Sequence, residues 1–223
     1  MRRIAVPLLF GLIGAAFLAG LGIWQLQRLE WKQAMLAEIA ARIAAAPVPL
    51  PPDPDAQADR FLPVEAMGVI EGDPVRVLVS QRGVGAAYRL ISRLDLGDRV
   101  VLLDRGIIPV ANDLPLAPQA QVAVTGNLHW PDERDAFTPA DDPETNTWFA
   151  RDVDALAAHF GTEPVLIIAR SITPAEPAVT PLPVSSAGIP NNHLGYAIQW
   201  FGLAAVWLGM TAFLVWRIRR RMT

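Results

Sequence analysis

Cysteine is absent from this 223-residue sequence, and the absence removes several kinds of chemistry. Without a thiol the chain can form no disulfide, no thiolate metal site and no cysteine nucleophile. Copper delivery through a Cys-x-x-x-Cys pair is excluded for the same reason. The absence says little about the cellular compartment.

Motifs of the common enzyme classes are also missing. The sequence has no nucleotide-binding glycine loop, no metal-protease helix and no convincing nucleophile with a neighbouring base. His129 and His159 are interpreted as solvated or structural residues. The acidic segment 132–144 could bind a cation, but its prolines and mixed spacing favour a flexible solvated loop. We therefore expect a protein that is not an enzyme, and an unrecognised membrane enzyme is the last of our hypotheses.

Acidic residues are absent from both ends of the chain. All 22 lie between Glu30 and Glu176, and the stretch from Arg28 to Glu176 carries 13 of the 19 basic residues, which gives it a net charge of −9. The ends carry six arginines and no acid, at positions 2, 3, 217, 219, 220 and 221. Basic residues that flank membrane spans stay in the cytoplasm. The charge pattern therefore predicts both termini inside and the middle outside.

Two long apolar runs lie at the two ends. The first extends from Ile4 to about Leu26, and the second carries no charge from Leu194 to Trp216. About 20 apolar residues suffice for a helix to cross a bilayer core. A signal peptide is the alternative for the first run, but the run is long enough to span and shows no clear small-residue cleavage site. The lack of a long Arg- and Ser-rich transit segment favours a bacterial protein.

Each predicted span has a face of small residues. Gly195, Gly202 and Gly209 recur every seven residues in the second span, and small residues let membrane helices approach closely. In the first span Gly11, Ala15, Leu18 and Gly22 share a face that could pack against these glycines.

His193, at the entrance of the second span, heads the opposite face, which continues with Ala197, Trp200, Ala204, Trp207 and Thr211. This face could hold a flat apolar ligand with imidazole at one end. The alternatives are that the tryptophans are interface anchors and that the histidine is a solvated or capping residue.

Between the spans the pattern changes from helical to β-rich. Helical spacing persists over residues 27–46 and ends at a proline-rich stretch. Strands are predicted near 61–70, 75–80, 87–94, 100–109, 121–128 and 165–170, and a short helix is predicted at 153–160, stopped by Gly161. Gly97-Asp98 indicates a hairpin turn, and residues 171–190 indicate an extended tether.

The predicted fold class is a membrane protein of α+β type, in which two transmembrane helices flank a β-rich extracytoplasmic domain, an antiparallel sheet or partial barrel with short helices. Its predicted parts are a transmembrane helix at 4–26, a juxtamembrane helix at 27–46, the extracytoplasmic domain with its tether at 47–190, a second transmembrane helix at 194–216 and a basic cytoplasmic tail at 217–223.

Several motifs, in this order between two terminal spans, carry a resemblance to a known family. They are Leu21 to Arg28 with Trp31-Lys32; Pro47 to Pro51; Leu103 to Pro109; Phe137, Pro139, Pro143, Asn146, Trp148, Arg151 and Asp152; Gly161, Glu163 and Pro164; and Asn192-His193-Leu194 with Tyr196, Trp200 and Gly202. With them the chain resembles the Surfeit locus protein 1 (Shy) family of cytochrome c oxidase assembly factors. It departs from the family pattern at Asp104, where Asn is usual, at Ile107, where an aromatic is usual, and at Ser92-Arg93, where Thr-Pro is usual.

The resemblance implies a role in placing haem a into the catalytic subunit of a terminal oxidase, with His193 as the ligand of the haem iron. Imidazole is a suitable axial ligand for haem. Tyr196 and Trp200, from the same motif, are further candidate haem contacts, and Arg105 is a candidate partner for a haem propionate or for a neighbouring acid.

The expected partners are the oxidase catalytic subunit, the lipid bilayer and, as a further candidate, haem a synthase; no nucleic acid is expected. The expected location is the bacterial inner membrane, with the central domain in the periplasm. The alternative function is a haem-free membrane scaffold that stabilises an immature oxidase subunit.

Overall fold

The structure is a computed structural model that describes residues 2–114 and 121–221. The chain divides into two compact units, residues 1–38 with 186–223 and residues 39–185. The first unit is built from helix α3 (His193–Arg220) and most of helix α1 (Arg2–Ala44), and both helices are long and apolar enough to cross a membrane. The second unit contains the sheet. Residues 222 and 223 of the predicted tail lie outside the described residues.

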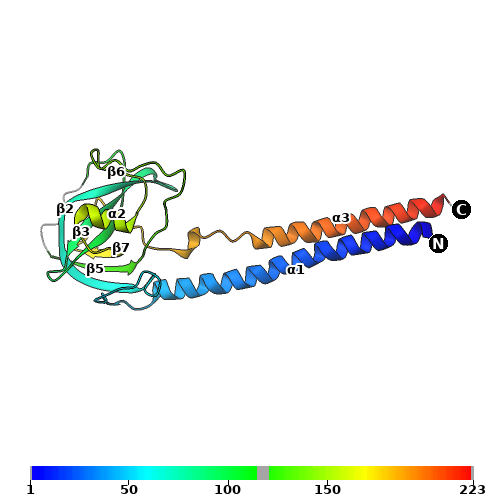
Figure 1. The fold of residues 1–223 in the computed structure, drawn as a ribbon, viewed down its shortest axis with the longest axis horizontal. Coiled ribbons are helices and arrows are strands. Elements are labelled where there is room, and N and C mark those ends of the chain that lie inside the picture. Colours follow the sequence, from blue (N-terminus) through cyan, green and yellow to red (C-terminus); the bar gives the residue numbers. More distant parts are fainter. Residues whose placement is uncertain (1, 115–120, 222–223) are drawn as a thin grey trace. The chain divides into compact units, whose positions relative to one another are not determined.

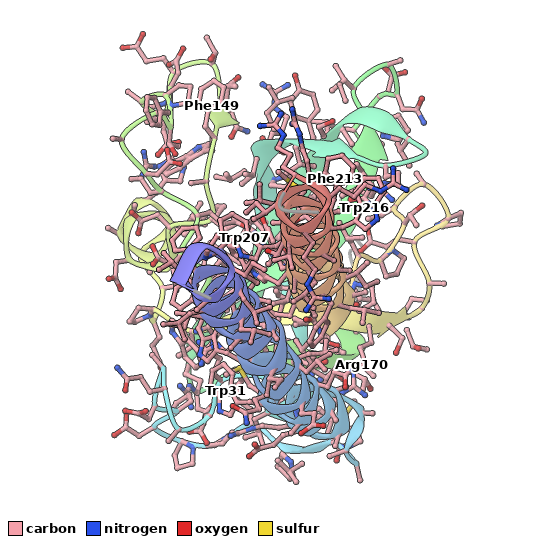
Figure 2. The ribbon with its side chains drawn as sticks, turned by 90° about the vertical axis from the view of Figure 1, so that its right-hand side faces the viewer. Trp31, Phe149, Arg170, Trp207, Phe213 and Trp216 are labelled. Carbon is pink, nitrogen blue, oxygen red and sulfur yellow. The ribbon has the colours of Figure 1, made fainter. Side chains whose placement is uncertain are left out.

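Helix α1 is one uninterrupted helix of 43 residues, so the segments predicted at 4–26 and 27–46 are continuous. It ends at Ala44, just before Pro47. The last carbonyl groups of a helix have no partner within the helix. Here the carbonyl of Ile43 accepts hydrogen bonds from Asn127 Nδ2, at 3.2 Å, and from the guanidinium of Arg170, which is labelled in Figure 2.

The two helices of the first unit lie side by side and run in opposite directions (Figure 1). Ala197 and Ala204 of α3 are buried in this pair. Glycines of α1 receive large side chains of α3: a Cβ at Gly22 would stand 2.8 Å from the ring of Phe201. Gly14 likewise faces the indole of Trp207, which Figure 2 shows beside α1.

We call Gly195, Gly202 and Gly209 of α3 the glycine seam. The predicted contact of α1 with this glycine seam is wrong. A Cβ added at Gly195, Gly202 or Gly209 would meet no atom within 4 Å in the described part of the chain. The physical reason is that the space beside Gly11, Gly14 and Gly22 of α1 is filled by Thr211, Trp207 and Phe201 of α3, and not by the glycines of α3.

The second unit is a sheet with one short helix. Its elements are β1 (Val48–Pro49), β2 (Pro63–Gln81), β3 (Gly85–Asp95), β4 (Val100–Pro109), β5 (Gln121–Leu128), β6 (Thr147–Trp148), α2 (Val153–Phe160) and β7 (Leu166–Thr173); a 3-10 turn, η1 (Ser186–Gly188), follows in the first unit. The predicted helix, its Gly161 end and the turn at Gly97 are confirmed. The first two predicted strands are one long strand, β2, with a bulge between Glu71 and Val75.

The sheet closes on itself, which agrees with the partial barrel, one of the two predicted forms of the domain. Strand β2 pairs with β3 through its second half and with β5 through its first, so the order β2-β3-β4-β7-β5 returns to β2. The β-rich prediction is confirmed, but the sheet is mixed and not purely antiparallel, because β4 and β7 run parallel. The parallel pair needs a long crossover connection, and β5 and α2 lie within it.

Both faces of this sheet are apolar. Leu103 and Ile167 belong to one core cluster, whereas their neighbours Leu102 and Ile168 pack in a second cluster with Trp148 and the helix α2. Successive residues of a strand point to opposite faces. Strands buried on both faces read as continuous hydrophobic runs, as in residues 100–103 of β4.

The predicted extended tether, residues 171–190, is wrong for its first part. Residues 171–173 belong to β7, and Thr180 exchanges backbone hydrogen bonds of 2.8 and 2.9 Å with Ile107 of β4. Gly106, at a φ of 124°, permits this approach, because a Cβ there would collide with the backbone of Thr180 and Pro181. The segment up to Leu182 is thus packed on the sheet.

Candidate functional site

A polar contact between the two helices joins His193 and Gln25. His193 is the first residue of α3, and its Nδ1 lies 2.8 Å from Oε1 of Gln25 in α1. The side chain of Gln25 is buried, with 9% exposure in a helix whose other buried positions are small residues. An amide oxygen only accepts hydrogen bonds, so Nδ1 is the nitrogen that carries the proton. The unshared electron pair of the ring is then on Nε2.

The side chain of Asn192 does not cap helix α3. Asn192 occupies the N-cap position of α3, yet its side chain makes no capping hydrogen bond. Its backbone angles, φ −98° and ψ 12°, differ from the extended conformation that presents a capping side chain to the helix. The imidazole of His193 is therefore held from α1 and not from its own helix start.

The aromatic residues predicted beside His193 divide into two groups. Tyr196 is 52% exposed and Trp200 is half-buried, so both retain surface on which a ligand can lie. Trp207 packs over Gly14 and contacts the ring of Phe10, with 5.5 Å between ring centroids. The part of the predicted ligand-binding face around Trp207 is thus covered by α1.

Arg105, the candidate partner of a propionate, is a buried structural residue. Its side chain has no exposed surface, and its Nε donates to Glu176 Oε1 at 3.0 Å while a second guanidinium nitrogen binds the other oxygen of that carboxylate. Ser92 Oγ lies 3.4 Å from Nη1. Of the two alternatives open in the sequence, the geometry corresponds to the ion pair with a neighbouring acid.

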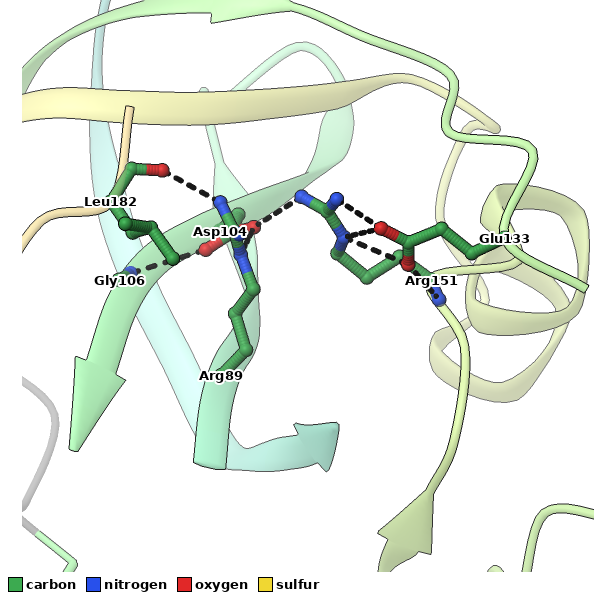
Figure 3. A network of polar contacts seen from close by, with 6 residues as sticks. All are labelled: Arg89, Asp104, Gly106, Glu133, Arg151 and Leu182. Carbon is green, nitrogen blue, oxygen red and sulfur yellow. Dashed lines mark hydrogen bonds and ion pairs between the residues drawn. The ribbon is translucent and has the colours of Figure 1, made fainter. Parts of the chain in front are cut away.

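A chain of four charges, which the sequence did not single out, lies in the second unit (Figure 3). Asp104 is fully buried and binds both Arg89 and Arg151, and Arg151 in turn binds Glu133. Asp104 also accepts a 3.1 Å hydrogen bond from the backbone N–H of Gly106. Two positive and two negative groups alternate, so the network is neutral as a whole.

The contacts within this network favour the ionised forms of Glu133 and Arg151. Burial alone raises the pKa of Glu133, but the hydrogen bonds and charge of Arg151 outweigh it and lower that pKa. For Arg151 burial lowers the pKa, but the hydrogen bonds that its guanidinium donates to Glu133, together with the charge of Asp104, reverse this and raise it. Burial dominates at Arg89, whose pKa is lowered.

The other two histidines have structural environments. His129 stacks on Phe61 with 5.0 Å between ring centroids, and burial together with the charges of Arg60 and Arg151 lowers its pKa to about 4. His159, in the last turn of α2, lies edge-on to Trp148.

The acidic segment 132–144 is a mostly exposed loop, as predicted, and its side chains make contacts with neighbouring residues. Glu133 binds Arg151, Arg134 binds Asp141, and Asp142 accepts hydrogen bonds from Thr145. Within residues 2–114 and 121–221 no three His, Asp or Glu side chains come together as metal ligands.

Two features of the site were not singled out from the sequence. Gln25 carries a signal, since it is an amide near the end of a long apolar run, and a polar group there is costly unless it has a partner. The pairing of Arg89 with Asp104 has no signal in the sequence, because the two residues are brought together only by the way in which β3 pairs with β4.

The family model described as the SURF1 family matches residues 12–205 of the chain. Surfeit locus protein 1 of Rattus norvegicus is 32% identical over 184 residues, which cover 71% of this chain and 60% of the relative. Surfeit locus protein 1 of Homo sapiens is 33% identical over 173 residues, 66% of this chain and 57% of the relative.

A SURF1-like protein of Drosophila melanogaster is 31% identical over 173 residues, again 66% of this chain and 57% of the relative. The chain thus spans about 60% of the length of the curated relatives it matches. The match of the family model includes both the Gln25 and the His193 positions. The chain belongs to the SURF1 family.

Proposed function

We propose that this protein is an assembly factor for cytochrome c oxidase that binds haem a through His193 and aids its insertion into the catalytic subunit. Membership of the SURF1 family supports the assembly role. The observation that carries the haem proposal is the hydrogen bond of His193 Nδ1 to Gln25, since it leaves Nε2 as the nitrogen available to iron.

The residues around His193 suit haem in their chemistry. Imidazole is an axial ligand of haem iron, and the half-buried Trp200 and exposed Tyr196 offer aromatic surface on the same helix. Haem a is here the cargo, and the protein's part is to bind and orient it. Arg105 has no role in this proposal, because its guanidinium is buried against Glu176.

A haem-free scaffold is the second candidate function, and the same contact favours it. A hydrogen bond between polar side chains of two membrane helices holds those helices together. In this alternative His193 and Gln25 lock α1 to α3, and the protein stabilises an immature oxidase subunit without binding haem.

The proposed location is a bacterial inner membrane, with both termini in the cytoplasm and residues from about 28 to 190 in the periplasm. Arginines flank both helices at the terminal ends, and the segment between the helices carries the acidic residues. The oxidase catalytic subunit is the proposed partner, with haem a synthase as a further candidate donor of the cargo.

A haem titration of the purified full chain in detergent tests the proposal. Haem a should give a Soret band that saturates, and His193→Ala should weaken binding and shift the band. His129→Ala and His159→Ala are matched controls that should change neither, because both rings pack within the second unit. Unchanged affinity and spectrum in His193→Ala would reject the ligand assignment and favour the scaffold.

A further inference from the structure

The side chain of Gln25 lies where it can control the chemistry of His193. Its Oε1 is 2.8 Å from Nδ1 of the imidazole, and the two residues are 168 positions apart in the sequence. Only 9% of Gln25 is exposed, so water competes poorly for the amide oxygen.

We infer that Gln25 is a positioning residue, which fixes His193 in the tautomer protonated at Nδ1 and presents Nε2 as the ligand of the iron. This inference rests on the proposed function. The tautomer of a histidine ligand is set by the hydrogen bond that its other nitrogen makes. Because the acceptor here is an amide oxygen, the bond needs the proton on Nδ1.

Close packing of the helices places Gln25 within reach of the ring. Gly22, three residues before Gln25 and on the same face of α1, receives the ring of Phe201. Ala197, one turn after His193, is buried in the same interface, with 1% exposure. The backbones therefore approach closely at Gly22 and Ala197, and the longer side chains of Gln25 and His193 meet next to this contact.

The contact affects a bound iron through the ring. An acceptor on the second nitrogen raises the basicity of an imidazole ligand and fixes its orientation, and loss of such a partner typically weakens metal binding about 10- to 100-fold. A carboxylate in the same place accepts a stronger hydrogen bond than an amide. Gln25→Leu and Gln25→Glu should therefore act in opposite directions on the electron density at Nε2.

The first test needs no haem. The full chain, with ¹⁵N-labelled histidine, is placed in detergent micelles, and the ring nitrogens of its three histidines are assigned with His129→Gln and His159→Gln. At a pH where the ring is neutral, His193 should show a protonated Nδ1 and an unprotonated Nε2. In Gln25→Leu this preference should disappear. A wild-type His193 protonated at Nε2 would overturn the inference, as would an unchanged tautomer in Gln25→Leu.

The second test measures haem binding and the midpoint potential of the bound haem. Gln25→Leu should weaken binding about 10- to 100-fold. Gln25→Glu should retain binding and move the midpoint potential to a more negative value, which a merely structural role would not do. Gln27→Leu is the matched control, because Gln27 is exposed on the same helix, and it should change neither quantity. Wild-type affinity in Gln25→Leu, or a Gln25→Glu potential equal to that of the wild type, contradicts the inference.

The two tests separate this inference from the proposed function. If His193→Ala binds haem as the wild type does, the ligand proposal fails, while the tautomer measurement still reports on Gln25 and His193. If His193→Ala loses haem but the Gln25 variants behave as the wild type, the ligand proposal stands and the positioning role of Gln25 is rejected.

Discussion

At the scale of single residues, the buried carboxylate of Asp104 links two arginines inside the second unit. It has no exposed surface and holds the guanidinium groups of Arg89 and Arg151 together. Removing one partner of a buried ion pair costs about 3–5 kcal/mol, because the remaining charges lose their compensation.

Asp104→Ala should lower the free energy of unfolding of the second unit by about that amount. Asp104→Asn should cost less, because an amide oxygen still accepts hydrogen bonds. Chemical denaturation of the full chain in detergent measures both, with Asp113→Ala at an exposed position as the control. A loss below about 1 kcal/mol in Asp104→Ala would show that the network contributes little.

His129 gives the second unit a dependence on pH. Its pKa in the folded chain is about 4, below the ordinary value of 6.5, so the folded state favours the neutral ring. The stability that this ring contributes is complete above about pH 6.5 and is lost as the pH falls toward 4. Solvent screening at this half-buried ring reduces the effect to about 1–2 kcal/mol.

His129→Gln should therefore flatten the fall in stability between pH 6.5 and pH 4. Thermal unfolding of the wild type and the variant across this range measures the difference. His159→Gln provides the comparison, since His159 is exposed at the end of α2. Parallel curves for the wild type and His129→Gln would refute the assignment.

At the scale of elements, the helix pair depends on the glycines of α1. A Cβ at Gly22 would stand 2.8 Å from the ring of Phe201, whereas one at Gly202 would meet nothing within 4 Å in the described part of the chain. Gly22→Leu should thus separate α1 from α3 at a cost of about 1–3 kcal/mol, and Gly202→Leu should leave the pair intact.

Pulsed EPR between spin labels at the exposed positions Ile13 and Leu208 measures this separation, and the chain has no native cysteine to interfere. The expected distance distribution is longer or broader in Gly22→Leu and unchanged in Gly202→Leu. Identical distributions in all three proteins would mean that Gly22 is not a close-packing position. The oxidase level in cells with Gly202→Leu then reports whether a partner helix covers the glycine seam.

The sequence predicted individual elements better than their connections. Gly161 and the Asp152 cap fix both ends of α2, so local chemistry sufficed there. Closure of the sheet depends on β2 pairing with two different strands, and no local pattern encodes that choice.

In the candidate site, too, single residues could be predicted from the sequence, whereas the contacts between distant residues could not. His193 was identifiable from its place at the start of an apolar run, but its contact with Gln25 depends on the packing of two helices at opposite ends of the sequence. The pairing of Arg105 with Glu176 depends similarly on a proline-rich segment that folds back onto β4.

At the scale of the whole molecule, the charge pattern predicts the topology. Reporter fusions at Ala56 and after Thr223 should report opposite sides of the membrane, with Ala56 in the periplasm. An alkaline phosphatase fusion should be active at the first site and inactive at the second. The same side for both sites would rule out two spans.

The most direct test of the central proposal is whether a nitrogen of His193 binds the haem iron. In the double variant His129→Gln/His159→Gln, His193 is the sole histidine, and the chain can be made with ¹⁵N-labelled histidine. Pulsed EPR of this protein with ferric haem a should show a hyperfine coupling from the ¹⁵N nucleus that is typical of a directly bound imidazole. Haem that binds at one equivalent without this coupling would contradict the account.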